Sequence, residues 1–197
     1  MLAELKSRYV RLLYRGFIPD AFLAIAEPAY YYNQLQDWLT QGKLQMDTLW
    51  VDGQPGGYIV YGVDGVDSSY GYIQEAAMAL PLDAQDHALL YQHALAALDG
   101  RGLGQVHQWV LRDNFRVRFQ LERSGFKADG ARRTITFEGQ PLQITRYLYR
   151  AHACVYQTGG GSLGAASRLL SFMIFEQGDA SKPCSEIITG KCPIPFW

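Results

Sequence analysis

The chain has 197 residues, of which 48% are hydrophobic and 19% are charged, and its formal net charge is −1. This composition is too apolar for a disordered chain, and without a net positive charge the chain lacks the field that holds nucleic acid. No apolar run approaches the roughly 20 residues of a membrane span, and the first residues lack the apolar segment of a signal peptide. We therefore expect a cytoplasmic protein that binds neither nucleic acid nor a membrane.

The first hundred residues predict helices, then a hairpin, a strand and a further helix. Apolar residues at helical spacing predict helices from residue 2, from the capping residue Asp20 and over residues 30–39. Strand-forming residues at 48–51 and 57–61 flank the turn 52–56, and residues 72–80 predict a third strand that Pro81 ends. Residues 83–98 predict a strong helix, which Gly100 ends.

The second half continues with a strand at 106–111, a short helix at 114–123, and a hairpin of 132–137 and 142–149. This order of elements predicts a mixed α/β fold with a largely antiparallel sheet. From Ala151 the composition changes, and the glycine-rich stretch 157–164 predicts a flexible linker. We therefore divide the chain into a domain of residues 1–150 and an extension of residues 151–197 whose role is open.

All three cysteines lie in the extension. Cys154, Cys184 and Cys192 lack the spacing of a zinc site, and we expect them to be reduced thiols. The sequence thus predicts no metal.

Residues 109–126 (WVLRDNFRVRFQLERSGF) resemble the GNAT acetyltransferase superfamily, whose members commonly have a strand ending V-L-x-x-N followed by A-R-x-F-Y-E-K-x-G-F. Asp129-Gly130 and the closing hairpin with Arg146-Tyr147 look like the last hairpin of that family. The resemblance covers about residues 7–150 and implies an α/β fold of the α+β type, with a mixed, mostly antiparallel sheet flanked by helices. It also implies transfer of an acetyl group from acetyl-CoA to an amine of a small molecule or peptide.

In this family two neighbouring parallel strands splay apart to take the cofactor, and the next helix presents its N–H groups to the pyrophosphate. By resemblance, acetyl-CoA would lie against Met78 and Leu80 and contact Asn114 and Arg118, while Glu75 would deprotonate the amine. The residues themselves leave alternatives open. Glu75 is also typical of a solvent-facing strand residue, Asn114 of a helix cap, and Arg118 of a surface charge.

Two further groups of residues have open interpretations. Tyr30, Tyr31, Tyr32 and Trp38 either line an acceptor pocket or pack in the core and on the surface. Residues 112–133 hold more basic than acidic side chains, which would draw an anionic ligand such as CoA or form a solvated face.

The sequence departs from the family pattern in the cofactor site. The family's phosphate loop reads Gln/Arg-x-x-Gly-x-Gly, and both glycines are replaced in the window 84–89. Asp83 and Asp86 lie at the start of the same helix, where we expect them to repel a pyrophosphate. Leu121 stands where the family usually has a tyrosine general acid. Two hypotheses therefore remain: an N-acetyltransferase that binds acetyl-CoA weakly, or an inactive GNAT-like binding domain that has lost CoA.

The family normally begins with a strand that residues 1–6 are too short to supply, so we expect one open sheet edge. The apolar segment 169–175 is rich in strand-forming residues. It either caps that edge of its own sheet or pairs with a second copy to form a homodimer. The alternative is an unrelated extension that packs as a short helix.

Overall fold

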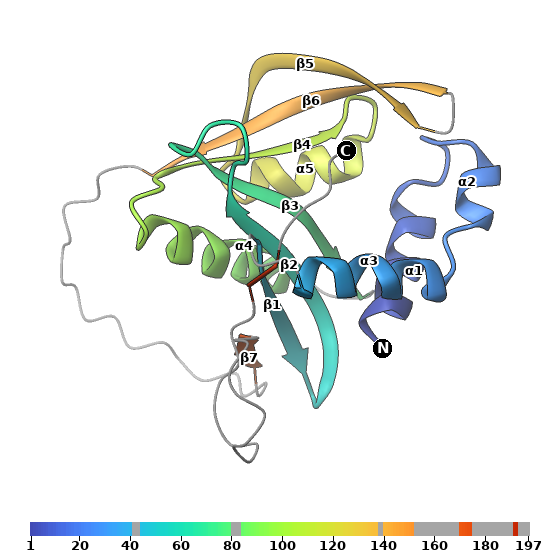
Figure 1. Cartoon of the computed structure of the whole chain (residues 1–197), viewed down its shortest axis with the longest axis horizontal. Coiled ribbons are helices and arrows are strands. Elements are labelled where there is room, and N and C mark those ends of the chain that lie inside the picture. The colour runs from blue at the N-terminus through green and yellow to red at the C-terminus, as the bar shows by residue number, and fades with distance from the viewer. Residues whose placement is uncertain (41–43, 80–83, 138–139, 152–169, 175–190, 193–197) are drawn as a thin grey trace.

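The computed structural model describes residues 1–40, 44–79, 84–137, 140–151, 170–174 and 191–192 (Figure 1). Its helices are α1 (Leu2–Leu13), α2 (Asp20–Ala24), α3 (Pro28–Thr40), α4 (Ala84–Asp99) and α5 (Phe115–Arg123). Its strands are β1 (Leu44–Val51), β2 (Gln54–Val63), β3 (Gly71–Met78), β4 (Gln105–Leu111), β5 (Lys127–Phe137), β6 (Gln140–Arg150), β7 (Leu170–Ile174) and β8 (Lys191–Cys192). The order of elements up to β6 confirms the sequence prediction.

All eight strands belong to one sheet, in the order β5-β6-β4-β3-β2-β1-β7, with β8 also paired to β1. Among these strands β3 and β4 form the one parallel pair, and every other pair is antiparallel. The predicted mixed, mostly antiparallel sheet flanked by helices is therefore confirmed. Within the described ranges, no helix combines the length and the apolar character needed to cross a bilayer.

The two parallel strands separate soon after they begin. Gly71 pairs with Val106 and Tyr72 pairs with His107, and the described residues of β3 and β4 form no further pair with each other. A side chain at Gly71 would come within 3.0 Å of Leu98 and Val106, so glycine lets α4 pack closely where the strands still touch. Beyond that point the strands splay and leave a gap at the centre of the sheet, as the resemblance implied.

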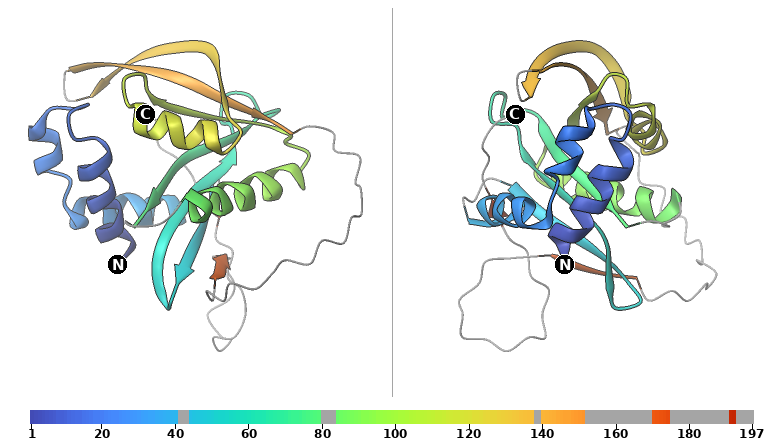
Figure 2. Two further views of the ribbon diagram at one scale, coloured as in Figure 1. Left: turned by 180° about the vertical axis from the view of Figure 1, so that it is seen from behind. Right: turned by 90° about the vertical axis from the view of Figure 1, so that its right-hand side faces the viewer.

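Helices cover both faces of the sheet (Figure 2). Tyr58 on β2 donates to Glu75, which also accepts from Lys6 of α1. Tyr61, three residues along, donates to Asp47, which is also bonded to His93 of α4. Helices α1 and α3 therefore lie on one face, and α4 lies on the other.

Helix α5 lies on the α4 face. Arg118 of α5 donates to the hydroxyl of Tyr147, which is paired with Gln108 on the neighbouring strand. The hydroxyl of Tyr91 on α4 donates to that same Gln108. Helices α4 and α5 therefore lie on the same face of the sheet.

Strand β7 closes the sheet at β1. It runs antiparallel to β1, from the pair Asp47 and Ile174 to the pair Val51 and Leu170. The structure describes no strand ahead of α1, and a segment from the extension covers the edge of β1. The prediction that this segment caps its own sheet is confirmed for residues 170–174, which form a strand and not the alternative helix. The predicted linker 157–164 lies outside the described residues.

Removal of residues 151–197 is expected to speed amide hydrogen exchange in residues 47–51, because these residues then lose their strand partner. A chain shortened only by residues 175–197 is the matched control, and it should keep the protection in 47–51. Hydrogen-exchange mass spectrometry measures both. Equal protection of these residues in the full chain and in both shortened chains would contradict the pairing.

Candidate functional site

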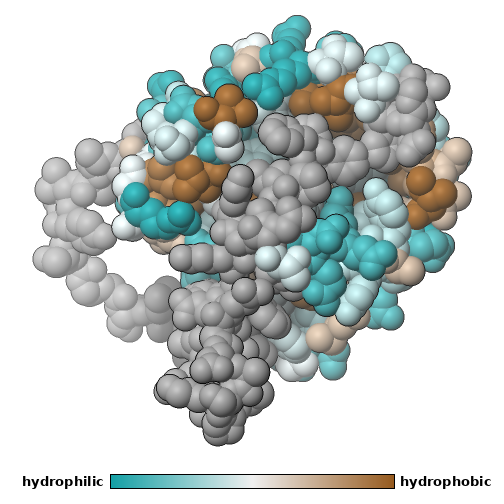
Figure 3. Space-filling view, in the orientation of Figure 1, coloured by the Kyte–Doolittle hydropathy of each residue, from teal (hydrophilic) through white to brown (hydrophobic). Residues whose placement is uncertain are grey.

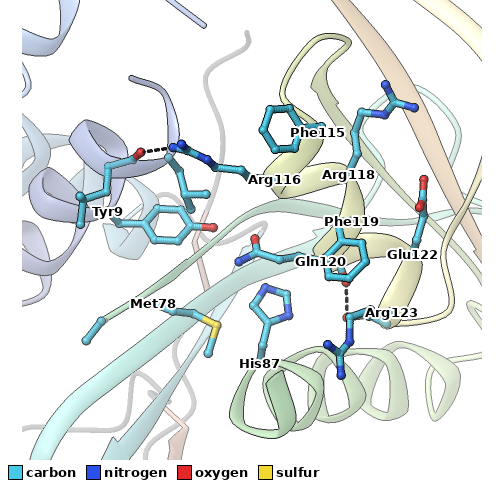
Figure 4. Close-up of a pocket in the computed structure, with 14 residues that line it drawn as sticks. Tyr9, Met78, His87, Phe115, Arg116, Arg118, Phe119, Gln120, Glu122 and Arg123 are labelled. Atoms are coloured by element: carbon cyan, nitrogen blue, oxygen red, sulfur yellow. Dashed lines mark hydrogen bonds between the residues drawn. The ribbon is translucent and has the colours of Figure 1, made fainter. Parts of the chain in front are cut away.

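A cavity of about 860 Å³ lies between the end of α1, the end of β3, the start of α4 and helix α5 (Figure 4). Apolar side chains such as Met78 and Phe119 form part of its wall. Three arginines, Arg116, Arg118 and Arg123, line the rest together with several polar side chains. The cavity therefore combines apolar surface with positive charge.

Local contacts hold each arginine in place. Arg116 donates to the carbonyl oxygen of Leu12 at 2.9 Å, and Arg118 donates to the carbonyl oxygen of Arg112 and to the hydroxyl of Tyr147, each at 2.9 Å. The guanidinium of Arg123 lies 5.7 Å from the ring centre of Phe119.

Among the described residues that line this cavity, Glu122 is the only acidic one. One of its carboxylate oxygens accepts a hydrogen bond from the Tyr147 hydroxyl. The local charge therefore favours an anionic ligand. This agrees with the interpretation of residues 112–133 as an anion-attracting region.

His87 projects into this cavity from the first turns of α4 (Figure 4). It is buried and stacks on Tyr91, with ring centres 5.0 Å apart. Burial lowers the pKa of His87 to about 4, so the imidazole is neutral near pH 7. His87 occupies the position of the first missing glycine, and an imidazole thus replaces open backbone at this end of the cavity.

The neighbouring acidic residue, Asp86, is not part of the cavity wall. Asp86 is buried and does not line the cavity, so its carboxylate does not face a ligand there. The expectation that Asp86 repels a pyrophosphate stays a prediction, since the charge of a carboxylate also acts on a ligand that it does not touch. Asp83 lies outside the described residues.

The four predicted cofactor residues have different surroundings. Met78 and Arg118 line the cavity, and Leu80 lies outside the described residues. Asn114 is fully buried, where its Oδ1 accepts from the Val117 N–H and its Nδ2 donates to the Leu13 carbonyl oxygen. The helix-cap interpretation of Asn114 is confirmed, and its contact with a cofactor stays a prediction.

A second cavity of about 240 Å³ is lined mainly by α1, α2, α3, β3, β4 and the β5–β6 hairpin, and also by Tyr91 of α4 and Val117 of α5. Tyr9 of α1 lines this cavity and also the larger one, and among the described residues it alone does so. The two cavities therefore adjoin at Tyr9, and residues of both β3 and β4 line the second one.

Glu75 lines the second cavity and is held there by two side chains. The Nζ atom of Lys6 lies 2.7 Å from Glu75 Oε2, and the hydroxyl of Tyr58 donates to Oε1. The side chain of Glu75 is 26% exposed, whereas that of Lys6 is 4% exposed. Glu75 is thus an ion-paired cavity residue, in contrast to the solvent-facing alternative.

The ammonium of Lys6 is enclosed by aromatic rings. It lies 4.3 Å from the ring centre of Trp38 and 4.8 Å from that of Tyr31, and it also donates to Gln34. Burial lowers the pKa of Lys6, and the opposing charge of Glu75 limits that effect. Sequence reasoning missed Lys6, although a lysine inside the apolar stripe of α1 was a readable signal.

The four aromatic residues Tyr30, Tyr31, Tyr32 and Trp38 divide between the two interpretations, a cavity lining and packing in the core or on the surface. Tyr31 and Trp38 are buried around Lys6, and Tyr31 and Tyr30 line the second cavity. Tyr32 is exposed and does not line it.

No family model and no curated protein matches this chain significantly, but solved structures do. One is the PaiA N-acetyltransferase from Thermoplasma acidophilum in complex with coenzyme A, with a TM-score of 0.55, 12% identity, and coverage of 76% of this chain and 90% of that one. Another is a GCN5-related N-acetyltransferase from Rhodopseudomonas palustris, with a TM-score of 0.55, 17% identity, and coverage of 76% and 87%. An aminoglycoside 6'-acetyltransferase type Ii has a TM-score of 0.51, 10% identity, and coverage of 78% and 92%.

The chain has a GNAT fold. The early separation of β3 from β4 agrees with the splayed parallel strands that the resemblance implied, and β7 lies at the edge of β1. The GNAT resemblance of residues 109–150 thus led to the right fold.

The position of the family's usual tyrosine acid differs in this chain. Leu121, at the position of the usual tyrosine acid, is fully buried in the core and lines neither cavity. The hydroxyl that lies between the cavities belongs instead to Tyr9, and burial raises its pKa, so it stays protonated. Among the described residues, no three His, Cys, Asp or Glu side chains are grouped as metal ligands.

Proposed function

We propose that the protein transfers an acetyl group from acetyl-CoA to the amine of a small molecule. The observation that supports this function is the pair of adjoining cavities that share Tyr9. A direct transfer needs the thioester and the amine to meet without a covalent enzyme intermediate. Two cavities that adjoin at Tyr9 suit this requirement.

The larger cavity suits the cofactor. Its volume of about 860 Å³ lies within the range of ligand sites, roughly 300–1,000 Å³. The pantetheine arm would extend along unpaired backbone of β3 toward Met78, and the phosphates would lie near Arg118 and Arg123.

The smaller cavity supplies the base. In this proposal Glu75 accepts the proton of the attacking amine, directly or through one water molecule. Lys6 and Tyr58 hold its carboxylate in one orientation. The new carbon–nitrogen bond forms as the carbon–sulfur bond breaks, and the hydroxyl of Tyr9 donates a proton to the departing thiolate. Leu121 has no proton to give, which makes Tyr9 the proposed donor.

The alternative is an inactive GNAT-like domain that has lost CoA. Its support is His87, whose side chain occupies the cavity at the position of a phosphate-loop glycine. Acetyl-CoA binding separates the two functions without knowledge of the amine.

Calorimetric titration is expected to show binding of acetyl-CoA to the wild-type protein. Arg123→Ala should weaken the affinity about five- to tenfold, the size expected for one exposed charge-assisted hydrogen bond. Arg101→Ala is the matched control, because Arg101 lies in the turn after α4 and bonds to Gln45, away from the cavity.

His87→Ala should increase the affinity for acetyl-CoA, because it removes the imidazole ring that lines the larger cavity. No heat at millimolar acetyl-CoA in the wild type and in His87→Ala would support the inactive domain.

A further inference from the structure

We propose that the amine acceptor is a small monoamine with an aromatic or branched aliphatic body, and not a polycation. This inference rests on the proposed function, and it names the substrate class for the smaller cavity. Three properties of that cavity support it: its walls, its charges and its size.

Two apolar walls line the outer part of the cavity. Ile18 and Phe22 contribute the wall beside α2, and Ile135 and Ile144 of the β5–β6 hairpin contribute another. The end of β5, the start of β6 and helix α2 lie at the same end of the molecule, and apolar surface is visible in that region (Figures 1 and 3). These four side chains are half-buried, so they keep apolar surface for a ligand.

Trp109 of β4 also lines the cavity and is half-buried. Its ring adds aromatic surface to the cavity wall, and the guanidinium of Arg133 lies over that ring. A sugar or a polyamine chain would leave most of this apolar surface without a matching partner.

The charges of the cavity disfavour a second cationic group. Glu75 is the carboxylate among its described lining residues, and it is already paired with Lys6. Beside the cavity, the guanidinium of Arg133 lies 4.4 Å from the ring centre of Trp109. The guanidinium of Arg146 lies 5.8 Å from the same ring centre and is ion-paired with Asp129. A polycation would bring its additional ammonium groups toward the like charge of Arg133, and the described lining residues offer them no second carboxylate.

Glu75 nevertheless retains capacity for one amine. Each carboxylate oxygen has two acceptor positions, and the bonds from Lys6 and Tyr58 use one on each oxygen. The cavity volume of about 240 Å³ is below the roughly 300–1,000 Å³ of typical ligand pockets, so the acceptor is small. One amine on a compact apolar body meets all of these conditions.

The test compares four amines in an assay of thiol release from acetyl-CoA. We expect kcat/KM for 2-phenylethylamine and isoamylamine to exceed that for spermidine and kanamycin by at least about tenfold, the size of discrimination that an apolar pocket gives. Wild-type activity that favours spermidine or kanamycin would overturn the inference and leave the acetyl-transfer function standing.

A charge placed on the apolar wall provides a second test. Ile144→Asp should lower kcat/KM for 2-phenylethylamine and raise it for spermidine, because the new carboxylate receives a second ammonium group. Thr136→Asp is the matched control, because Thr136 is exposed on the neighbouring strand and does not line the cavity. An unchanged ratio in Ile144→Asp would contradict the assignment of this wall to the acceptor.

Amine binding is measured separately by the fluorescence of Trp109, with Trp109→Phe as the blank. We expect 2-phenylethylamine to change this fluorescence at concentrations where spermidine does not. If acetyl-CoA fails to bind but this difference is present, the proposed function fails and the ligand class stands. If neither amine changes the signal, or spermidine alone does, the ligand class is wrong.

Discussion

Glu75→Gln is expected to lower kcat by about 10²- to 10⁴-fold, the usual contribution of a general base. The glutamine side chain has nearly the same shape and still offers an oxygen to Lys6 or Tyr58, but it accepts no proton. The affinity for acetyl-CoA should be unchanged, because Glu75 does not line the larger cavity. Steady-state kinetics with the best amine of the panel, together with calorimetry, measures both quantities.

Gln74→Ala is the matched control for this experiment. Gln74 lines the same cavity beside Glu75 but has no carboxylate, and its replacement should change kcat little. Tyr9→Phe in the same assay tests the proposed proton donor, and it should lower kcat while acetyl-CoA still binds. A kcat that stays at the wild-type value in Glu75→Gln would remove Glu75 from the mechanism.

Glu75→Gln should also have a large effect on the free energy of unfolding. Glu75→Gln leaves the ammonium of Lys6 buried without an opposing charge, and we expect it to lower the free energy of unfolding by about 3 kcal/mol at pH 7. This value is near the lower end for a broken buried ion pair, because a glutamine oxygen still accepts from Lys6. Lys6→Met should cost less, since Glu75 is partly exposed and water can solvate it.

The pH dependence of this effect has a definite sign. Burial lowers the pKa of Lys6 below its value in the unfolded chain, and loss of Glu75 removes the charge that raises it again. Between the two pKa values the unfolded chain binds more protons, so the stability of Glu75→Gln should rise as the pH increases toward about 10.4, the ordinary lysine pKa. Urea denaturation at a series of pH values measures this change.

The double variant Lys6→Met/Glu75→Gln distinguishes stability from catalysis. It removes both charges together, and we expect it to regain most of the stability that Glu75→Gln loses, but none of its activity. Recovery of activity in the double variant would show that the low kcat of Glu75→Gln arises from unfolding.

Local signals in the sequence predicted the elements and one part of the site well. The cap at Asn114 depends on groups within three residues, and the structure contains it. Glu75 and Met78 were placed on β3 from strand pattern and family resemblance, and each lines one of the two cavities.

Tertiary contacts could not be predicted in the same way. Lys6 and Glu75 are 69 positions apart, and only the packing of α1 on the sheet brings them together. The shared position of Tyr9 has the same origin. The burial of Asp86 was equally unpredictable, because a place in the first turn of a helix does not fix the direction in which the side chain points.

The strand β7 has a consequence for the time course of synthesis. Translation adds about 5–20 residues per second, and about 20 residues separate Arg150 from Leu170, so β7 follows β6 by about one to four seconds. During this interval the nascent chain already holds β1 to β6, but the outer edge of β1 has no partner. Nascent chains on one messenger RNA are close neighbours, and an open strand edge is a site of pairing between chains. The risk of edge-to-edge association is therefore greatest while the ribosome is still synthesising the extension, and it ends when β7 joins β1.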